Sequence, residues 1–204
     1  MDTERSITIA CIHGGRRNGM TAKMVQEIAK GARFGLSSAH SEWGHIQITT
    51  AFYGLGEPEH DIPFLVDPDI QKPDDVVTYL WGEVKEAGGL ILATPVRWNN
   101  MGALMMRFLE WGYFMEKDEG WPLEGMPVGY AAHGDIDGGQ SAVNAMQNIM
   151  MHLKCTTPQD GHFYRIISRL TQTDSDPEYQ WMLEDAQLLG LRVAEAAYRR
   201  KYIA

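Results

Sequence analysis

Residues 7–30, ITIACIHGGRRNGMTAKMVQEIAK, determine how the rest of the chain is interpreted. Six mostly apolar, β-prone residues come first, and a polar loop broken by glycines follows. From Thr21, the apolar residues Val25, Ile28 and Ala32 fall at the spacing of one helix face. A strand, a tight loop and a helix in this order bring several backbone N–H groups and a helix N-terminus to one point. Such a point attracts a phosphate, although a glycine-rich turn without a ligand is the alternative interpretation.

The loop itself, residues 14–21, reads GGRRNGMT and can be compared with the phosphate-binding motif G-x-x-x-x-G-K-T. It matches at every fixed position except the lysine, which is Met20 here. Because that lysine contacts the β- and γ-phosphates, its loss argues against cleavage of a nucleoside triphosphate. The loop also lacks the Gly-x-Gly-x-x-Gly pattern of dinucleotide-binding folds. We therefore expect one terminal phosphate, held by backbone N–H groups, Asn18, Thr21 and Arg17.

Composition limits the class of protein. With 204 residues, 44% of them hydrophobic and 22% charged, the chain is most simply a single domain, 1–204, with a substantial core. A net charge of −9 argues against nucleic-acid binding. No apolar run is long enough to span a membrane, and the polar start MDTERS is unlike a secretory signal. Cys11 and Cys155 match no metal-ligand spacing, so we expect a cytoplasmic protein without a metal site.

Apolar runs and glycine or proline breaks divide the chain into alternating strands and helices. Residues 89–94 and 127–132 are continuous apolar runs, typical of strands buried on both faces of a parallel sheet. The other expected strands are 7–12, 45–50 and 155–163. The expected helices include one capped by Asp74 or Asp75, one over 100–113 and a final one from Pro177. This alternation predicts an α/β fold with an open parallel sheet and helices on both faces.

Three polar loops, 13–20, 95–100 and 133–140, follow the first, third and fourth expected strands. In open parallel sheets the ligand lies beyond the carboxyl ends of the strands, so these loops are expected to converge there. Residues 51–73 are the least regular part of the chain and are a candidate functional loop or lid. The acidic stretch 116–119 is expected to be a charged surface loop.

At these loops the chain resembles the flavodoxin-like NADPH-dependent FMN reductases, a family that includes quinone reductases and iron–sulfur flavoproteins. Residues 14–21 are similar to its first loop, G-S-P-R-x-x-G-N-T, with one residue removed. Residues 94–110, TPVRWNNMGALMMRFLE, resemble its second signature, S-P-V-Y-W-x-x-M-x-A-x-M-K-x-F-L-D. Residues 134–140, GDIDGGQ, resemble its third loop, G-x-x-G-G-Q, with one residue added. The resemblance implies a flavodoxin-like, doubly wound sheet of five parallel strands in the order 2-1-3-4-5.

The resemblance also implies where the cofactor FMN meets the chain. The FMN phosphate would be held by the first loop, through Gly14, Gly15, Arg17, Asn18, Gly19, Met20 and Thr21. The isoalloxazine edge would meet the second, through Pro95, Val96, Arg97, Trp98, Asn99, Asn100 and Met101. The pyrimidine side would meet the third, through His133, Gly134, Asp135, Gly138 and Gly139. Hydride transfer from NAD(P)H to flavin N5 needs no protein acid or base, so these residues would only orient the reactants, Trp98, Asn99 and Asn100 above all.

Several residues depart from the family pattern. Gly15 stands where a serine is usual and Met20 where an asparagine is usual, which removes two side-chain donors to the phosphate. Arg97 replaces a common aromatic residue and would favour an anionic substrate or the phosphates of the nicotinamide cofactor. Residues 51–73 contain no cysteine, so an iron–sulfur cluster is excluded there on ligands alone.

We therefore expect an FMN-dependent NAD(P)H oxidoreductase that reduces a small-molecule acceptor such as a quinone, azo dye, nitroaromatic or free flavin. The family resemblance and the Trp- and Met-rich helices imply a homodimer or homotetramer. Two alternatives are a flavodoxin-type electron carrier that docks to protein partners and a flavin-free scaffold protein. Trp98 could also be only a packing anchor, and His13 only a loop residue that bonds backbone carbonyls.

Overall fold

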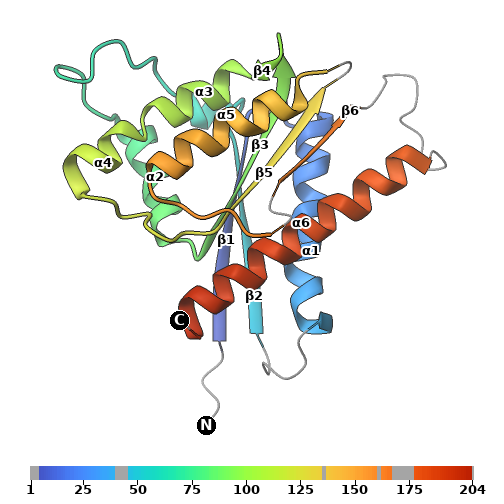
Figure 1. The fold of residues 1–204 in the computed structure, drawn as a ribbon. Helices are drawn as coiled ribbons and strands as arrows, with labels where there is room; N and C mark the ends of the chain where they lie inside the picture. Colours follow the sequence, from blue (N-terminus) through green and yellow to red (C-terminus); the bar gives the residue numbers. More distant parts are fainter. Residues whose placement is uncertain (1–4, 40–45, 135–136, 160–161, 167–176, 204) are drawn as a thin grey trace.

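The computed structural model describes residues 5–39, 46–134, 137–159, 162–166 and 177–203 (Figure 1). Five parallel strands form the sheet: β1 (Arg5–His13), β2 (Ile46–Gly54), β3 (Gly89–Arg97), β5 (Val128–Gly134) and β6 (His162–Ile166). They lie in the order β2-β1-β3-β5-β6 and pair in parallel throughout. Counted along the parallel strands, this is the predicted order 2-1-3-4-5, and the flavodoxin-like α/β fold is confirmed.

Helices cover both faces of the sheet. They are α1 (Met20–Ala39), α2 (Asp75–Glu86), α3 (Ala103–Glu110), α4 (Tyr113–Glu119), α5 (Gly139–His152) and α6 (Pro177–Tyr202). Helices α1 and α6 lie on one face, and α2, α3, α4 and α5 lie on the other (Figure 1). The predicted cap of α2 is confirmed for Asp74, whose Oδ1 accepts the Val77 N–H at 2.8 Å.

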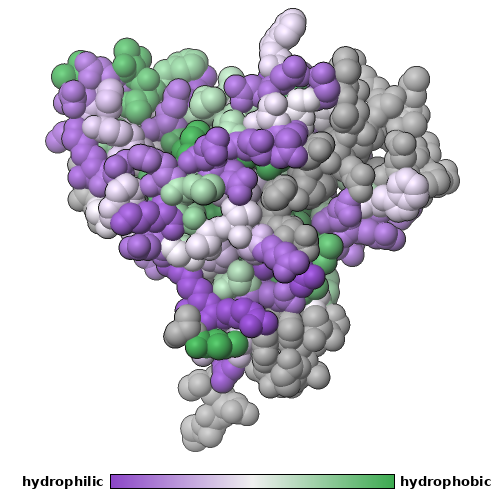
Figure 2. All heavy atoms as spheres, in the orientation of Figure 1, coloured by the Kyte–Doolittle hydropathy of each residue, from purple (hydrophilic) through white to green (hydrophobic). Residues whose placement is uncertain are grey.

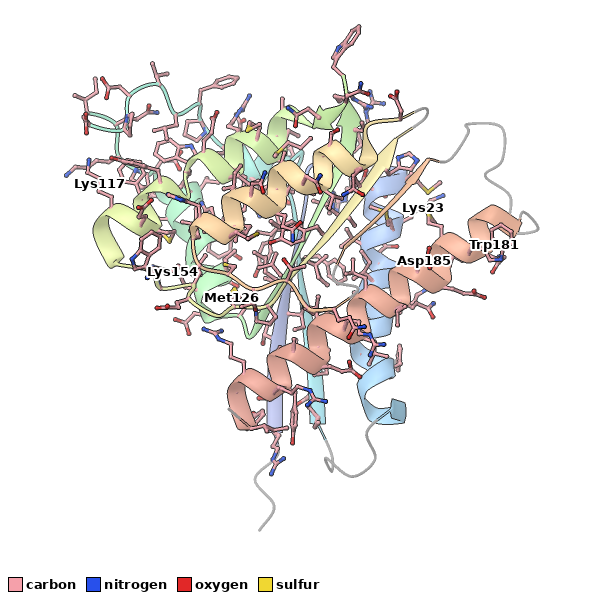
Figure 3. All side chains as sticks on the ribbon, viewed as in Figure 1. Lys23, Lys117, Met126, Lys154, Trp181 and Asp185 are labelled. Atoms are coloured by element: carbon pink, nitrogen blue, oxygen red, sulfur yellow. The ribbon has the colours of Figure 1, made fainter. Side chains whose placement is uncertain are left out.

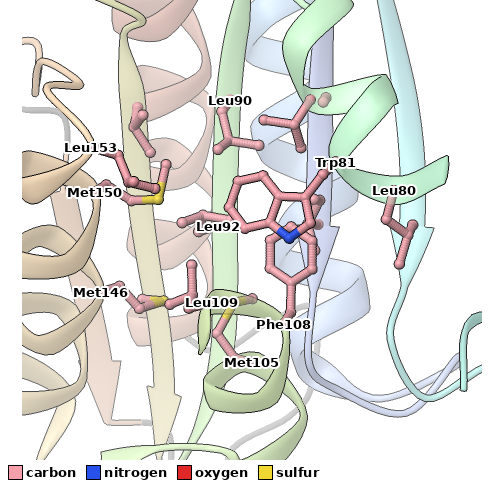
Figure 4. Packing of buried hydrophobic residues seen from close by; sticks show 14 of the residues in the cluster. Leu80, Trp81, Leu90, Leu92, Met105, Phe108, Leu109, Met146, Met150 and Leu153 are labelled. Carbon is pink, nitrogen blue, oxygen red and sulfur yellow. The ribbon is translucent and has the colours of Figure 1, made fainter. Parts of the chain in front are cut away.

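Burial on both sides explains why the central strands read as unbroken apolar runs. Along β1, Ile9 and Cys11 pack under α1 and α6, whereas Ala10 and Ile12 face the opposite layer. In that layer the rings of Trp81 and Phe108 are stacked, with centroids 4.6 Å apart and planes inclined by 7° (Figure 4). Such a pair stabilises the fold by about 0.5–1.5 kcal/mol beyond the contribution of the area it buries.

The α1–α6 contact depends on two glycines. A Cβ on Gly31 would lie 1.9 Å from the carbonyl oxygen of Gln187, and one on Gly190 would lie 1.8 Å from that of Ile28. The helix backbones therefore touch, and any larger side chain at Gly31 or Gly190 would force them apart. This close contact fixes the relative position of α1 and α6, the two helices that pack against one face of β1.

Several element boundaries differ from those predicted. Strand β2 continues to Gly54 instead of ending at residue 50, and β6 begins at His162, later than predicted. The predicted helix over 100–113 is confirmed only for residues 103–110, which form α3. Before it, a short strand β4 (Asn100–Met101) pairs antiparallel with β3, and a separate helix begins at Tyr113. The expected charged loop 116–119 is also wrong, because these residues form the end of α4. No helix among the described residues is long and apolar enough to cross a membrane.

The irregular segment after β2 is attached to α3 and α4. Arg107 and Trp111 donate to the carbonyl oxygens of Ile62 (2.8 Å) and Pro63 (2.9 Å). Figure 3 shows Lys117 next to the same loop, and its Nζ lies 3.3 Å from Asp69 Oδ1. The exposed apolar side chains of Phe64, Val66 and Ile70 lie on this loop. Figure 2 shows green, hydrophobic spheres at the upper left, where this loop lies. Part of the candidate lid, from Ile62 to Asp69, is therefore held against α3 and α4, whereas residues 51–54 belong to β2.

Candidate functional site

A cavity of about 980 Å³ lies at the carboxyl ends of β1, β3 and β5. It is lined by Gly14, Gly15, Arg16, Arg17, Gly19, Met20, Thr21, Gly56, Pro95, Arg97, Gly102, Ala103, Leu104, His133 and Gly134. These residues come from all three predicted loops, so the predicted convergence of the loops is confirmed. Ligands of open α/β sheets bind at this edge, at the point where the strand order reverses.

The first loop is held at both ends by backbone hydrogen bonds. The Gly14 N–H donates to Ala93 O at 2.9 Å, which ties the loop to β3, and the Gly19 N–H donates to Arg16 O at 2.9 Å, which closes a tight turn. A Cβ on Gly15 would lie 2.7 Å from the Cβ of Thr21, the buried second residue of α1. The structure thus gives a physical reason for glycine where the family usually has serine.

The second loop is a β-hairpin, which the sequence pattern did not indicate. Val96 pairs with Met101 and Arg97 with Asn100, so Trp98 and Asn99 form a two-residue turn. Both have positive φ, 49° and 58°, as type I′ turns require. This conformation is unusual for a tryptophan, and such strain is concentrated at functional sites. The indole of Trp98 is fully exposed (101%), so its interpretation as a packing anchor is wrong.

The base of the hairpin is fixed by Thr94, which is fully buried. Its Oγ1 accepts the Gly102 N–H at 2.8 Å, where α3 begins. The Met101 N–H donates to Asn100 Oδ1 at 2.8 Å and is therefore occupied within the hairpin. This backbone donor of the second loop is therefore already bonded within the protein.

The third loop packs directly against the hairpin. A Cβ on Gly134 would lie 2.9 Å from Val96 Cβ, and one on Gly138 would lie 2.4 Å from Asn99 Cα. Gly138, with φ of 81°, is the residue before α5. The N-terminus of α5 is thereby brought next to the β3–β4 turn. Asp135, also predicted here, lies outside the described residues.

The cavity is electropositive, although the whole chain has a net charge of −9. Three arginines line it, Arg16, Arg17 and Arg97, and its described lining contains no aspartate or glutamate. The N-termini of α1 and α3 reach it through Met20 and Ala103, and each adds partial positive charge. Such an arrangement favours an anionic ligand.

The reactive side chains of this region are few. His133 is the one histidine among the described lining residues, which include no cysteine, lysine or carboxylate. Both cysteines are buried elsewhere, and burial raises the pKa of the Cys11 and Cys155 thiols to about 12. Neither thiol is a nucleophile at neutral pH. The site is therefore suited to binding and orienting reactants rather than to acid–base or thiol chemistry.

The cavity contains only part of the predicted set of residues. The predicted residues on its lining are Gly14, Gly15, Arg17, Gly19, Met20, Thr21, Pro95, Arg97, His133 and Gly134. Those described elsewhere on the same three loops are Asn18, Val96, Trp98, Asn99, Asn100, Met101, Gly138 and Gly139. The lining residues that were not predicted are Arg16, Gly56, Gly102, Ala103 and Leu104. Gly56 could have been found, because it follows a strand that ends at the same edge.

The dimensions and polarity of the cavity suit flavin mononucleotide. Small-molecule and cofactor sites measure about 300–1,000 Å³, and this cavity is at the upper end of that range. Its glycine- and arginine-rich end suits a phosphate, whereas Pro95, Ala103 and Leu104 supply apolar surface for a ring system. The residues that are present therefore fit the cofactor.

Comparison with solved structures shows the same fold at low sequence identity. The chain is similar to RosB with a bound 8-demethyl-8-formylriboflavin-5′-phosphate (TM-score 0.71, 16% identity, 96% of this chain and 81% of that one). It is also similar to an oxidoreductase from Corynebacterium diphtheriae (TM-score 0.68, 17% identity, 96% of this chain and 98% of that one). A third similar structure is that of FerB, an NAD(P)H:(acceptor) oxidoreductase from Paracoccus denitrificans (TM-score 0.66, 13% identity, 93% of this chain and 98% of that one). No curated protein matches the sequence.

The family assignment comes from the sequence itself. Residues 7–166 match the model of the NADPH-dependent FMN reductase family. The match begins in β1, ends with β6 and includes all three loops that surround the cavity. The chain therefore belongs to the NADPH-dependent FMN reductase family and is an FMN-binding, NAD(P)H-dependent oxidoreductase.

Proposed function

We propose that the chain transfers electrons from NAD(P)H to a small-molecule acceptor, a quinone, azo compound, nitroaromatic or free flavin, at the cavity beyond β1, β3 and β5. The observation that carries this proposal is the convergence of three loops on one electropositive cavity. Bound FMN would supply the chemistry of hydride acceptance from the nicotinamide at N5 and of onward electron transfer. The protein supplies binding and orientation.

The proposed arrangement assigns one part of FMN to each loop. Residues 14–21 hold the phosphate, because they combine backbone N–H groups, the N-terminus of α1 and Arg17. The β3–β4 hairpin would meet the isoalloxazine ring, and the loop from His133 to Gly139 would meet its pyrimidine side. The α5 N-terminus favours the negative charge of a reduced ring.

Arg97 and Trp98 are proposed to act at the rim of the cavity. Arg97 is exposed, and its Nη1 donates to the carbonyl oxygen of Val96 at 3.1 Å, which keeps the cation at the hairpin. It attracts the phosphates of the nicotinamide cofactor or an anionic acceptor. Exposed Trp98 offers a large apolar surface for a ring or for a second copy of the chain, in keeping with the proposed homodimer or homotetramer.

Anaerobic stopped-flow absorbance tests this proposal with the protein saturated with FMN. We expect NADPH or NADH to bleach the flavin band in one rapid phase, and a quinone to restore it. Free FMN with the same nicotinamide is the control. A flavin that stays oxidised until a partner reductase is added would contradict the proposal and favour the electron-carrier alternative.

A further inference from the structure

An ion pair of unequal exposure lies beside the proposed phosphate end of the cavity. Arg17 Nη1 lies 3.6 Å from Glu57 Oε2, and the side chain of Arg17 is 80% exposed, whereas that of Glu57 is only 13% exposed. Arg17 lines the cavity, and so does Gly56, the neighbour of Glu57. A carboxylate therefore stands directly behind one of the cations that would meet the phosphate.

The local fold fixes the position of Glu57. Its N–H donates to the carbonyl oxygen of Gly54 at 3.0 Å, and a Cβ on Gly54 would lie 3.1 Å from Glu57 Cγ. That same Cβ would lie 3.1 Å from Cε1 of His13, so the imidazole and the carboxylate side chain lie against one residue. Glu57 is thus held against the end of β2, whereas the side chain of Arg17 is largely exposed.

His13 does not neutralise this carboxylate at neutral pH. Burial lowers the pKa of His13 below its usual value of 6.5, and the effect of Glu57 in raising it is smaller. His60 lies on the other side, with its Nδ1 3.1 Å from Gly54 O. Arg17 is therefore the cation that faces Glu57 within ion-pair distance among the described residues.

We propose that Glu57 is an internal anion that competes with the flavin 5′-phosphate for Arg17 and so determines how strongly the site prefers FMN to riboflavin. This inference rests on the proposed function. A phosphate dianion at the first loop repels Glu57 and draws Arg17 away from it. Because Gly15 and Met20 supply no side-chain donors to the phosphate, the contribution of Arg17 carries more weight. We therefore expect the site to discriminate less between FMN and riboflavin than it would with a neutral residue at position 57.

The sizes of the two electrostatic effects support this assignment. A 3.6 Å pair with one exposed partner contributes little to the stability of the fold. Glu57 and the bound phosphate, by contrast, have the same sign of charge at the edge of a partly enclosed cavity, where screening is weaker than in bulk water. Glu57 therefore affects phosphate binding more than it affects stability.

Equilibrium titration of the full chain with FMN and with riboflavin tests the inference, because riboflavin has the same ring and ribityl chain without the phosphate. We expect Glu57→Gln to tighten FMN binding about tenfold and to leave riboflavin binding unchanged. The gain should shrink at high salt. Glu59→Gln, on an exposed neighbour, makes the same charge change and should leave both affinities unchanged.

Arg17→Gln provides an independent test through a double-mutant cycle. The loss of FMN affinity should be larger in the Glu57→Gln background than in the wild type, because Arg17 is then available to the phosphate alone. Equal changes for FMN and riboflavin, or no change on Glu57→Gln, would overturn the inference while leaving the flavin site intact. Failure of the wild type to bind either flavin would instead overturn the proposed function, and the inference with it.

Discussion

Gly138 and Asn99 are in direct backbone contact, since a Cβ on Gly138 would lie only 2.4 Å from the Cα of Asn99. The two residues belong to different loops, one before α5 and the other in the β3–β4 turn, and both have positive φ. Each loop therefore supports the conformation of the other. This contact sets the geometry of the side of the cavity where we place the isoalloxazine ring.

The first prediction concerns Gly138→Ala. The added methyl group would both meet Asn99 and occupy an unfavourable φ of 81°, so the two loops would separate. We expect a loss of more than about 1 kcal/mol in the free energy of unfolding and weaker FMN binding. Urea unfolding and FMN titration measure these effects.

Gly120→Ala is the control for this prediction. Gly120 also has positive φ, 62°, but a methyl group added there would have no neighbouring atom within 4 Å. The Gly120→Ala protein should therefore lose stability through backbone strain alone and bind FMN as tightly as the wild type. Unaltered FMN binding by Gly138→Ala would contradict the account.

The second prediction concerns the residue that restores the usual family pattern. Gly15→Ser should weaken FMN binding rather than strengthen it, because its Cβ would lie 2.7 Å from Thr21 Cβ and would displace the start of α1. Calorimetric titration with FMN measures the change. Gly82→Ser, which places its Cβ in open space on α2, should leave FMN affinity unchanged. Tighter FMN binding by Gly15→Ser would show that Thr21 moves aside easily.

The third prediction concerns pH. Burial lowers the pKa of His13 in the folded protein, so the unfolded chain binds a proton more readily near pH 6. The corresponding stability is fully present above about pH 6.5 and is lost as the pH falls below that value. We expect His13→Gln to show a smaller drop in Tm between pH 7.5 and 5.5 than the wild type. His152→Gln, on an exposed histidine, is the matched control, and parallel Tm profiles for His13→Gln and wild type would refute this assignment.

The fourth prediction concerns Arg97→Ala. Arg97 lines the cavity mouth and is exposed, so its removal should raise the KM for NADPH or for an anionic quinone by about threefold to tenfold. The Tm should stay within the error of the wild type. Steady-state kinetics with Arg33→Ala, on the exposed side of α1, provides the control. Unchanged KM values for both substrates would exclude a binding role for Arg97.

Much of the fold was predictable because burial leaves a direct mark on the sequence. Residues 89–94 form an unbroken apolar run because both faces of β3 are covered. The cap at Asp74 could be predicted because a short acceptor side chain precedes a helix with an apolar face. The three loops were found for a similar reason, because each follows one of these buried strands.

The β3–β4 hairpin could not be predicted by the same reasoning. Its turn residues, Trp98 and Asn99, lack the Asn-Gly or Asp-Gly pair that indicates positive φ in a two-residue turn. Tertiary contacts with Gly138 hold this conformation instead, and they join residues about 40 positions apart. Gly56 was missed for a related reason, because β2 was expected to end before Gly54.

The most direct test of the central claim is a crystal structure of the protein with FMN. The account predicts electron density for the phosphate between residues 14 and 21, and for the ring along the β3–β4 hairpin next to Gly138. Density in the separate groove between α1 and α6, which is lined by Phe34, Leu188 and their neighbours, would contradict it. An empty cavity at saturating FMN would contradict it equally.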